Sequence, residues 1–141
     1  MARQYHYIGC FVRPDELFRH MDVISTGHLD RVIQTPHITF EYKPETVDES
    51  LFGKRIGVQI MGYGNDGENE GVRVALHSED KRLRKMIQNI PTPHITVSVS
   101  NTGKSVNTRF LEFYPISSFE IEGVFGGYDS EGNIITEILR N

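Results

Sequence analysis

The chain has 141 residues, of which 38% are hydrophobic and 24% charged, and its formal net charge at pH 7 is −4. This length and composition predict one globular domain over residues 1–141, and no apolar run reaches the roughly 20 residues of a membrane span. The acidic charge argues against a protein that coats long nucleic acid, but it leaves room for a small nucleotide or one RNA end as partner.

The cysteine content and the N-terminal residues suggest a location. Cys10 is the one cysteine and cannot form an internal disulfide, which fits a reducing cytoplasm. No basic head followed by a long apolar stretch opens the chain, so no signal peptide and no membrane partner are expected. Cys10 lies in an apolar run and is interpreted as a core residue rather than a nucleophile.

The first part of the chain follows a strand–helix–strand pattern. Residues 7–12 are typical of a buried strand. A helix is predicted over about 14–24, because Pro14 suits the first helical turn and apolar residues then recur at helical spacing. A strand over 35–42 follows.

The middle of the chain repeats this pattern. Alternating apolar residues at 54–63 and 71–77 predict a hairpin, joined by a segment rich in glycine and asparagine. A helix over about 79–89 is predicted next, with Ser78 as its N-cap, followed by an alternating strand at 93–100.

The last part of the chain predicts a second hairpin. Apolar residues at 119–125 and at 134–135 flank a glycine-rich segment, residues 126–132. This segment is interpreted as a turn, with Tyr128 inside it.

One pentapeptide, Thr-Pro-His-Ile-Thr, occurs twice, at residues 35–39 and 92–96. Each copy is followed by an apolar residue and preceded by a strand and a helix. We therefore expect a duplicated unit of the α+β class. The expected architecture has two lobes of antiparallel sheet, short helices packed outside and a central groove, with the strand order left open.

The repeated residues suit chemistry on a phosphodiester. Because side chains alternate along a strand, His37 and Thr39 share one face, as do His94 and Thr96, while the apolar residues between and after them face the helix. A neutral imidazole can take a proton from an attacking oxygen while an imidazolium donates one to the leaving oxygen. Threonine hydroxyls can bind the phosphoryl oxygens.

Two His-x-Thr motifs followed by an apolar residue resemble the 2H phosphoesterase superfamily, which includes LigT-type RNA ligases and cyclic phosphodiesterases and the 2′,5′-oligoadenylate phosphodiesterases. The resemblance implies a two-lobed fold with both motifs lining a central groove. It implies that His37 and His94 are catalytic and that Thr39 and Thr96 bind the substrate phosphate.

The function implied is that of a hydrolase of phosphoric diesters, independent of metal and cofactor, acting on a small nucleotide or in RNA processing. The simplest substrate is a 2′,3′-cyclic phosphate of a nucleotide or RNA end. A 2′–5′ linkage or a cyclic oligonucleotide signal stays open as the substrate. A module that binds a nucleotide or RNA end without turnover is the alternative of another class.

Four more side chains are candidates for contact with the substrate. Arg13 follows the first strand, and Lys104 and Arg109 follow the second motif. Tyr128 can stack on a base or donate to phosphate. Tyr128 can equally be a turn residue with its ring on the surface, and for the three basic residues a solvated surface charge is the favoured interpretation. No pattern of cysteine, aspartate or glutamate ligands accompanies the two motif histidines, so no metal site is expected.

Overall fold

The structure is a computed structural model that describes residues 4–136. Its strands are β1 (Tyr5–Val12), β2 (Arg31–Val32), β3 (His37–Tyr42), β4 (Arg55–Asn65), β5 (Asn69–His77), β6 (His94–Val99), β7 (Tyr114–Asp129) and β8 (Ile134–Ile135). Its helices are α1 (Pro14–Ile24) and α2 (Lys81–Gln88), with 3-10 turns η1 (Glu49–Leu51) and η2 (Ser105–Phe110). The expected α+β class, rich in antiparallel sheet with few short helices, is confirmed. Among the described helices, none is long and apolar enough to cross a bilayer.

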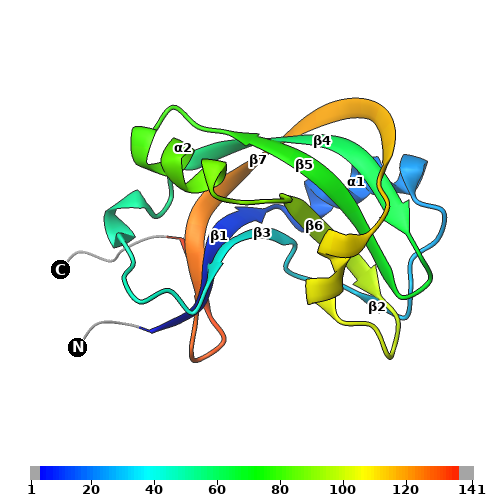
Figure 1. Cartoon of the computed structure of the whole chain (residues 1–141), viewed down its shortest axis with the longest axis horizontal. Helices are drawn as coiled ribbons and strands as arrows, with labels where there is room; N and C mark the ends of the chain where they lie inside the picture. The colour runs from blue at the N-terminus through cyan, green and yellow to red at the C-terminus, as the bar shows by residue number, and fades with distance from the viewer. Residues whose placement is uncertain (1–3, 137–141) are drawn as a thin grey trace.

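The strands form one strongly twisted antiparallel sheet (Figure 1). Its order is β2-β6-β5-β4-β7-β1-β3, and β8 pairs with β7. Although β5, β4, β7 and β1 separate β6 from β3 in this order, β3 and β6 contact each other. The twist of the sheet therefore brings the two motif strands together from its opposite ends.

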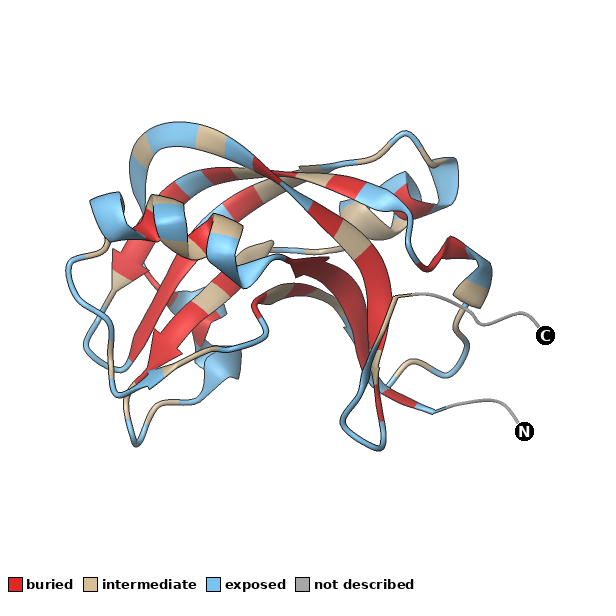
Figure 2. Ribbon diagram, turned by 180° about the vertical axis from the view of Figure 1, so that it is seen from behind, coloured by how far each residue is buried: buried red, intermediate tan, exposed pale blue. Residues whose placement is uncertain are grey.

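The hydrophobic core lies against one face of the sheet, since alternate residues of its strands, such as Ile8, Cys10 and Val12 of β1, belong to it. Figure 2 shows the buried residues concentrated in the strands. The amphipathic helix α1 buries Leu17 and Met21 in it, and α2 buries Leu83. Ile38 and Ile95, the residues between the histidine and threonine of each motif, are buried in the same core. By alternation, the motif histidines and threonines belong to the opposite face of the sheet.

Each motif strand pairs with an earlier strand in the same register. Thr39 lies opposite Gly9 on β1, and Thr96 lies opposite Gly71 on β5. In both pairs the register shifts at the glycine, so that the residue after the threonine is a bulge. A Cβ atom on these glycines would lie 2.1 Å and 2.8 Å from a carbonyl oxygen of the motif strand, and only glycine permits this approach.

The bulge in β3 changes which face its last residues occupy. Phe40 is the extra residue, and its ring packs 5.5 Å from that of Phe125 in the core. Beyond it, Tyr42 lies opposite Tyr7 on β1, with the ring centroids 5.9 Å apart. Uninterrupted alternation would separate Tyr42 from Thr39, but the bulge returns the tyrosine to the threonine's face of the sheet.

Helix α2 begins later than the sequence predicted. The carboxylate of Asp80 accepts hydrogen bonds from the amides of Arg82 and Leu83, at 2.8 Å and 3.1 Å, which makes Asp80 the N-cap. The expected cap, Ser78, instead accepts from the amide of Asp80. Serine and aspartate both cap helices well, and the path of the chain in the folded protein selects Asp80.

The predicted hairpin is confirmed by the pairing of β7 with β8, but its turn covers residues 130–132 alone, and residues 126–129 of the expected turn are strand. β7 continues to Asp129, and Tyr128 pairs with Tyr7 of β1. Gly126 and Gly127 are required by close packing, because a Cβ on either would lie 2.5 Å from a neighbouring atom. The glycines therefore mark close approach within the sheet rather than chain reversal.

Candidate active site

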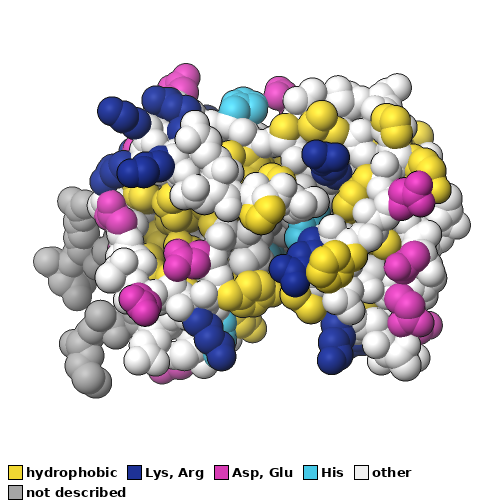
Figure 3. Space-filling model, in the orientation of Figure 1, with side chains coloured by type: hydrophobic (Ala, Val, Ile, Leu, Met, Phe, Trp, Pro, Cys, Tyr) yellow, Lys and Arg dark blue, Asp and Glu magenta, His cyan; other side chains and the backbone are white. Residues whose placement is uncertain are grey.

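One cavity brings both copies of the motif together. It has a volume of about 610 Å³ and is lined by His37, Thr39, His94 and Thr96, and we call it the histidine cavity. Figure 3 shows this face of the molecule hollowed at its centre, where a histidine and a basic side chain lie between hydrophobic ones. The four residues that the sequence placed in a catalytic set are thus gathered in one space.

The two imidazoles are held in the same way. The Nδ1–H of His37 donates to the carbonyl of Thr35 at 2.9 Å, and that of His94 donates to the carbonyl of Thr92 at 2.7 Å. Because a carbonyl can only accept, Nδ1 carries a proton in both rings. The Nε2 atom of each ring is therefore the nitrogen available for proton transfer, and it is unprotonated in the neutral form.

Burial lowers the pKa of both histidines below the ordinary value. At His37 the bond to Thr35 opposes this shift in pKa, and the neighbouring His94 adds to it. At His94 the bond to Thr92 opposes the shift in pKa, and the positive charge of Arg109 adds to it. Two neutral imidazoles at neutral pH are the result in the free protein, and a bound anion would favour protonation of either.

The two threonines have different surroundings. The hydroxyl of Thr96 donates to Thr108 Oγ1 at 2.8 Å or to the carbonyl of Ser105 at 3.2 Å. Thr108 is itself held by a 3.0 Å bond from the buried side chain of Asn69. Within residues 4–136, the hydroxyl of Thr39 makes no hydrogen bond, so it is free to donate to a ligand.

His37 rests against an aromatic ring that the sequence analysis did not single out. Tyr7 stacks on the imidazole at 4.5 Å between centroids and 18° between planes, with its hydroxyl 3.4 Å from Nδ1. Burial and the neighbouring Tyr128 and Tyr42 raise the pKa of Tyr7, which keeps its hydroxyl neutral. Strand alternation in 7–12 would have placed Tyr7 opposite the buried Ile8, but its contact with His37 depends on the β1–β3 pairing.

The candidate substrate residues fall into two groups. Tyr128 stacks on Tyr7 at 5.2 Å and so belongs to the aromatic support of His37. Arg13 is exposed and pairs with Asp15, and Lys104 is exposed as well. Neither Arg13 nor Lys104 lines the histidine cavity.

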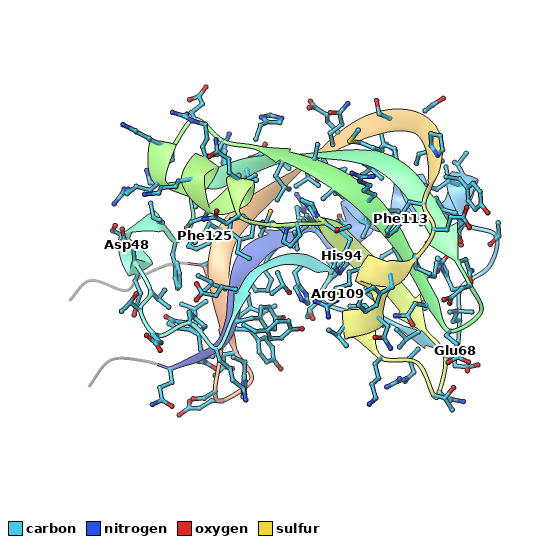
Figure 4. All side chains as sticks on the ribbon, in the orientation of Figure 1. Asp48, Glu68, His94, Arg109, Phe113 and Phe125 are labelled. Carbon is cyan, nitrogen blue, oxygen red and sulfur yellow. The ribbon has the colours of Figure 1, made fainter. Side chains whose placement is uncertain are left out.

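Arg109 is the basic residue that the fold brings to the cavity. Its charge acts on His94, and Figure 4 shows the two side chains next to each other. The guanidinium also lies 4.6 Å from the centre of the Phe110 ring, which steadies it by a cation–π contact. Both residues lie on η2, a turn that lacks the periodicity by which the longer elements are predicted.

A second polar cluster has catalytic residue types but a structural geometry. His28 Nδ1 lies 2.7 Å from the carboxylate of Glu70 and 3.5 Å from Ser25 Oγ. In a catalytic triad the nucleophile and the carboxylate use different ring nitrogens, and here they share one. Glu70 is fully buried and also accepts from Ser25, Tyr63 and Ser98. Burial raises the pKa of Glu70, but these donors and His28 outweigh it and lower the pKa overall. The cluster ties the loop after α1 to the sheet.

The described residues contain no group of three or more histidine, cysteine, aspartate or glutamate side chains that could hold a metal ion. A comparison with protein-family models finds no match to the chain, and a comparison with characterised protein sequences finds none either. The relation to the 2H phosphoesterases stays a prediction from the two motifs.

Proposed function

We propose that the protein is a metal-independent phosphodiesterase of the 2H type. The observation that carries the proposal is the convergence of two His-x-Thr motifs in one cavity, each with its histidine held through Nδ1 and its Nε2 left for proton transfer. General acid and base catalysis by two such groups suits the displacement of one oxygen by another at phosphorus.

We further propose that the chain is a duplicated unit with two lobes around a central groove. In the sheet, β3-β1-β7 and β6-β5-β4 follow one another as mirrored halves. In each half the middle strand, β1 or β5, is followed along the chain by a helix. Each motif threonine lies opposite a glycine at a bulge. A repeated register, together with a repeated sequence, supports an internal repeat better than a repeated pentapeptide alone.

In the proposed mechanism, His37 and His94 divide the two proton transfers. The neutral ring takes the proton of the attacking hydroxyl or water at Nε2 as the new P–O bond forms. The protonated ring gives its Nε2 proton to the leaving oxygen as the old P–O bond breaks. Thr39 donates its free hydroxyl to one non-bridging oxygen, and Thr96 donates to the other by turning its hydroxyl from Thr108 and Ser105 to the ligand. Arg109 balances the negative charge of these oxygens.

The substrate class is a phosphodiester of a small nucleotide or an RNA end, for which a 2′,3′-cyclic phosphate is the simplest test compound. The first experiment measures turnover of 2′,3′-cyclic nucleotides and of 2′–5′ and 3′–5′ dinucleotides in EDTA, and phosphorus NMR reads the position of the product phosphate. His37→Ala and His94→Ala are each expected to lower kcat by about 10²- to 10⁴-fold.

His77→Ala is the matched control, since His77 is exposed, pairs with Glu120 and does not line the histidine cavity. Circular dichroism checks that all variants fold. Activity that EDTA abolishes, or that survives in both motif variants, would contradict the mechanism. A folded wild type that binds these compounds without cleaving them would favour the binding module.

A further inference from the structure

Two exposed aromatic rings stand at the histidine cavity. Tyr42 is 58% exposed and Phe110 is 71% exposed, and both line the cavity. Exposed hydrophobic surface beside polar groups is typical of a binding site, because such surface is costly to leave in water.

The two rings are linked by contacts to different histidines of the cavity. Tyr42 lies edge-on to Tyr7, which stacks on His37. On the other side, His94 lies beside Arg109, whose guanidinium covers Phe110. Since His37 and His94 line the same cavity on two strands that contact each other, each histidine has its own aromatic ring within this set of contacts.

The charge of the cavity matches one phosphodiester. Within the described part of the chain, its lining residues include one arginine, Arg109, no lysine, and one carboxylate, Glu41, and the charges of Arg109 and Glu41 cancel. The net charge of the cavity therefore becomes positive only when one imidazole is protonated. A diester carries one negative charge, whereas a terminal phosphate or a triphosphate carries more and calls for several cations. The cavity is therefore better suited to an internal linkage than to a chain of phosphates.

We propose that Tyr42 and Phe110 are two nucleobase-stacking sites on either side of the scissile phosphate. The preferred substrate is then a phosphodiester with a nucleoside on both sides, in a linear or cyclic oligonucleotide, rather than a 2′,3′-cyclic mononucleotide. Stacking on an aromatic ring accepts any base, and it requires a single strand whose bases are splayed apart.

This inference rests on the proposed phosphodiester site and makes it more specific. Cleavage forms one P–O bond from the attacking oxygen, which belongs to water or to the free neighbouring ribose hydroxyl (2′ in a 3′–5′ linkage, 3′ in a 2′–5′ linkage), and breaks the P–O bond to the second nucleoside. That nucleoside leaves with the proton of the imidazolium. In a linear substrate both products keep a base, each on its own aromatic ring, and in a cyclic one the opened chain keeps both bases.

The test compares kcat/KM for matched diesters with two bases and with one. The two-base substrates are 2′–5′ and 3′–5′ diadenosine monophosphate, and the one-base partners are the adenosine 2′- and 3′-methyl phosphate diesters. Tyr42→Ala and Phe110→Ala are each expected to lower kcat/KM on the two-base substrate by roughly 5- to 150-fold. On the methyl diester, the variant that lacks the ring for the missing base is expected to lose much less kcat/KM than it loses on the two-base substrate. A loss that Phe110→Ala shows equally on both substrates is assigned to its contact with Arg109.

Tyr114→Ala is the control, because Tyr114 is 62% exposed and does not line the cavity. Tyr42→Phe and Phe110→Tyr keep a ring and are expected to retain activity. The inference is overturned if one-base and two-base diesters react equally well, or if both alanine variants behave like the control.

If the wild type cleaves none of these compounds, the proposed catalysis fails, and the inference is judged by binding. Calorimetry with the same diesters is then expected to show tighter binding of the two-base ligand, lost in both alanine variants. Equal binding of the two ligand types would overturn the stacking sites as well.

Discussion

The two copies of Thr-Pro-His-Ile-Thr have the same local geometry but different surroundings. In both, the histidine donates through Nδ1 to the carbonyl two residues earlier. The strand that pairs with each motif differs, however. Two residues before the glycine opposite the motif threonine, β1 has Tyr7 and β5 has Asn69. Tyr7 covers His37 with an aromatic ring, whereas Asn69 holds Thr108 and through it Thr96.

This difference shows how a repeated peptide can serve two roles in one site. The pentapeptide determines the direction of the imidazole, because the bond to the carbonyl is local. The strands that pair with it decide whether the histidine or the threonine is supported by neighbours. The first copy offers an unengaged hydroxyl at Thr39, and the second offers an imidazole beside the charge of Arg109.

The largest difference is expected between Thr39→Val and Thr96→Val. Thr39→Val is expected to lower kcat by about 100-fold, the cost of one lost donor to a charged transition state, without changing the free energy of unfolding. Thr96→Val is expected to lower kcat as well, and in addition to lower the free energy of unfolding by about 1 kcal/mol, because the Thr96 hydroxyl also makes a hydrogen bond within the fold. Turnover assays and urea denaturation separate the two effects. Equal losses of stability would show that the two hydroxyls are alike.

Arg109→Met tests the charge on the second side. We expect KM to rise by about tenfold, which corresponds to the lower end of the free energies typical of one charge-assisted hydrogen bond to phosphate. The pKa of His94 is expected to rise, because the neighbouring positive charge that lowers it is removed. A titration followed by NMR of the imidazole measures this shift. Arg13→Met is the control, since Arg13 is exposed outside the cavity, and a similar change there would contradict a specific role for Arg109.

Tyr7→Leu tests the aromatic support on the first side. Loss of the stacked ring lets water reach His37, so the pKa of His37 is expected to rise and kcat/KM to fall about fivefold. Tyr7→Phe keeps the stacking and is expected to stay within about twofold of the wild type, because the hydroxyl contact at 3.4 Å is long. If Tyr7→Phe falls as far as Tyr7→Leu, the hydroxyl rather than the ring supports His37.

The smallest expected effect is the position of the pH optimum. With lower pKa values the base remains neutral at lower pH, and the acid also loses its proton at lower pH. Both limbs of the kcat/KM profile therefore shift to lower pH. Two unperturbed imidazoles would give an optimum near pH 6.5, and we expect the observed optimum below that value. Bound phosphate favours protonation, so the kcat profile should lie at higher pH than that of kcat/KM. An optimum of kcat/KM above pH 7 would contradict the effect of burial.

Much of the local structure follows from the sequence alone. Periodicity placed the helices and most strands, and the alternation of His37 and Thr39 with Ile38 correctly separated polar from buried residues. These features depend on neighbours within one strand or one helical turn, and a pattern of side chains is enough to predict them. Even here, the choice of Asp80 over Ser78 as N-cap depended on the path of the chain.

Only the tertiary structure decided which residues meet at the cavity. The bulge at Phe40 carries Tyr42 to the face of Thr39, and the curled sheet brings β3 to β6. The β7 pairing sets Tyr128 behind Tyr7, and η2 delivers Arg109. Each of these depends on strand register or on contact between distant segments, which side-chain periodicity does not specify. The sequence by itself determined the chemical groups and their local direction. The twist and strand pairing of the sheet determined which residues lie next to them in the cavity.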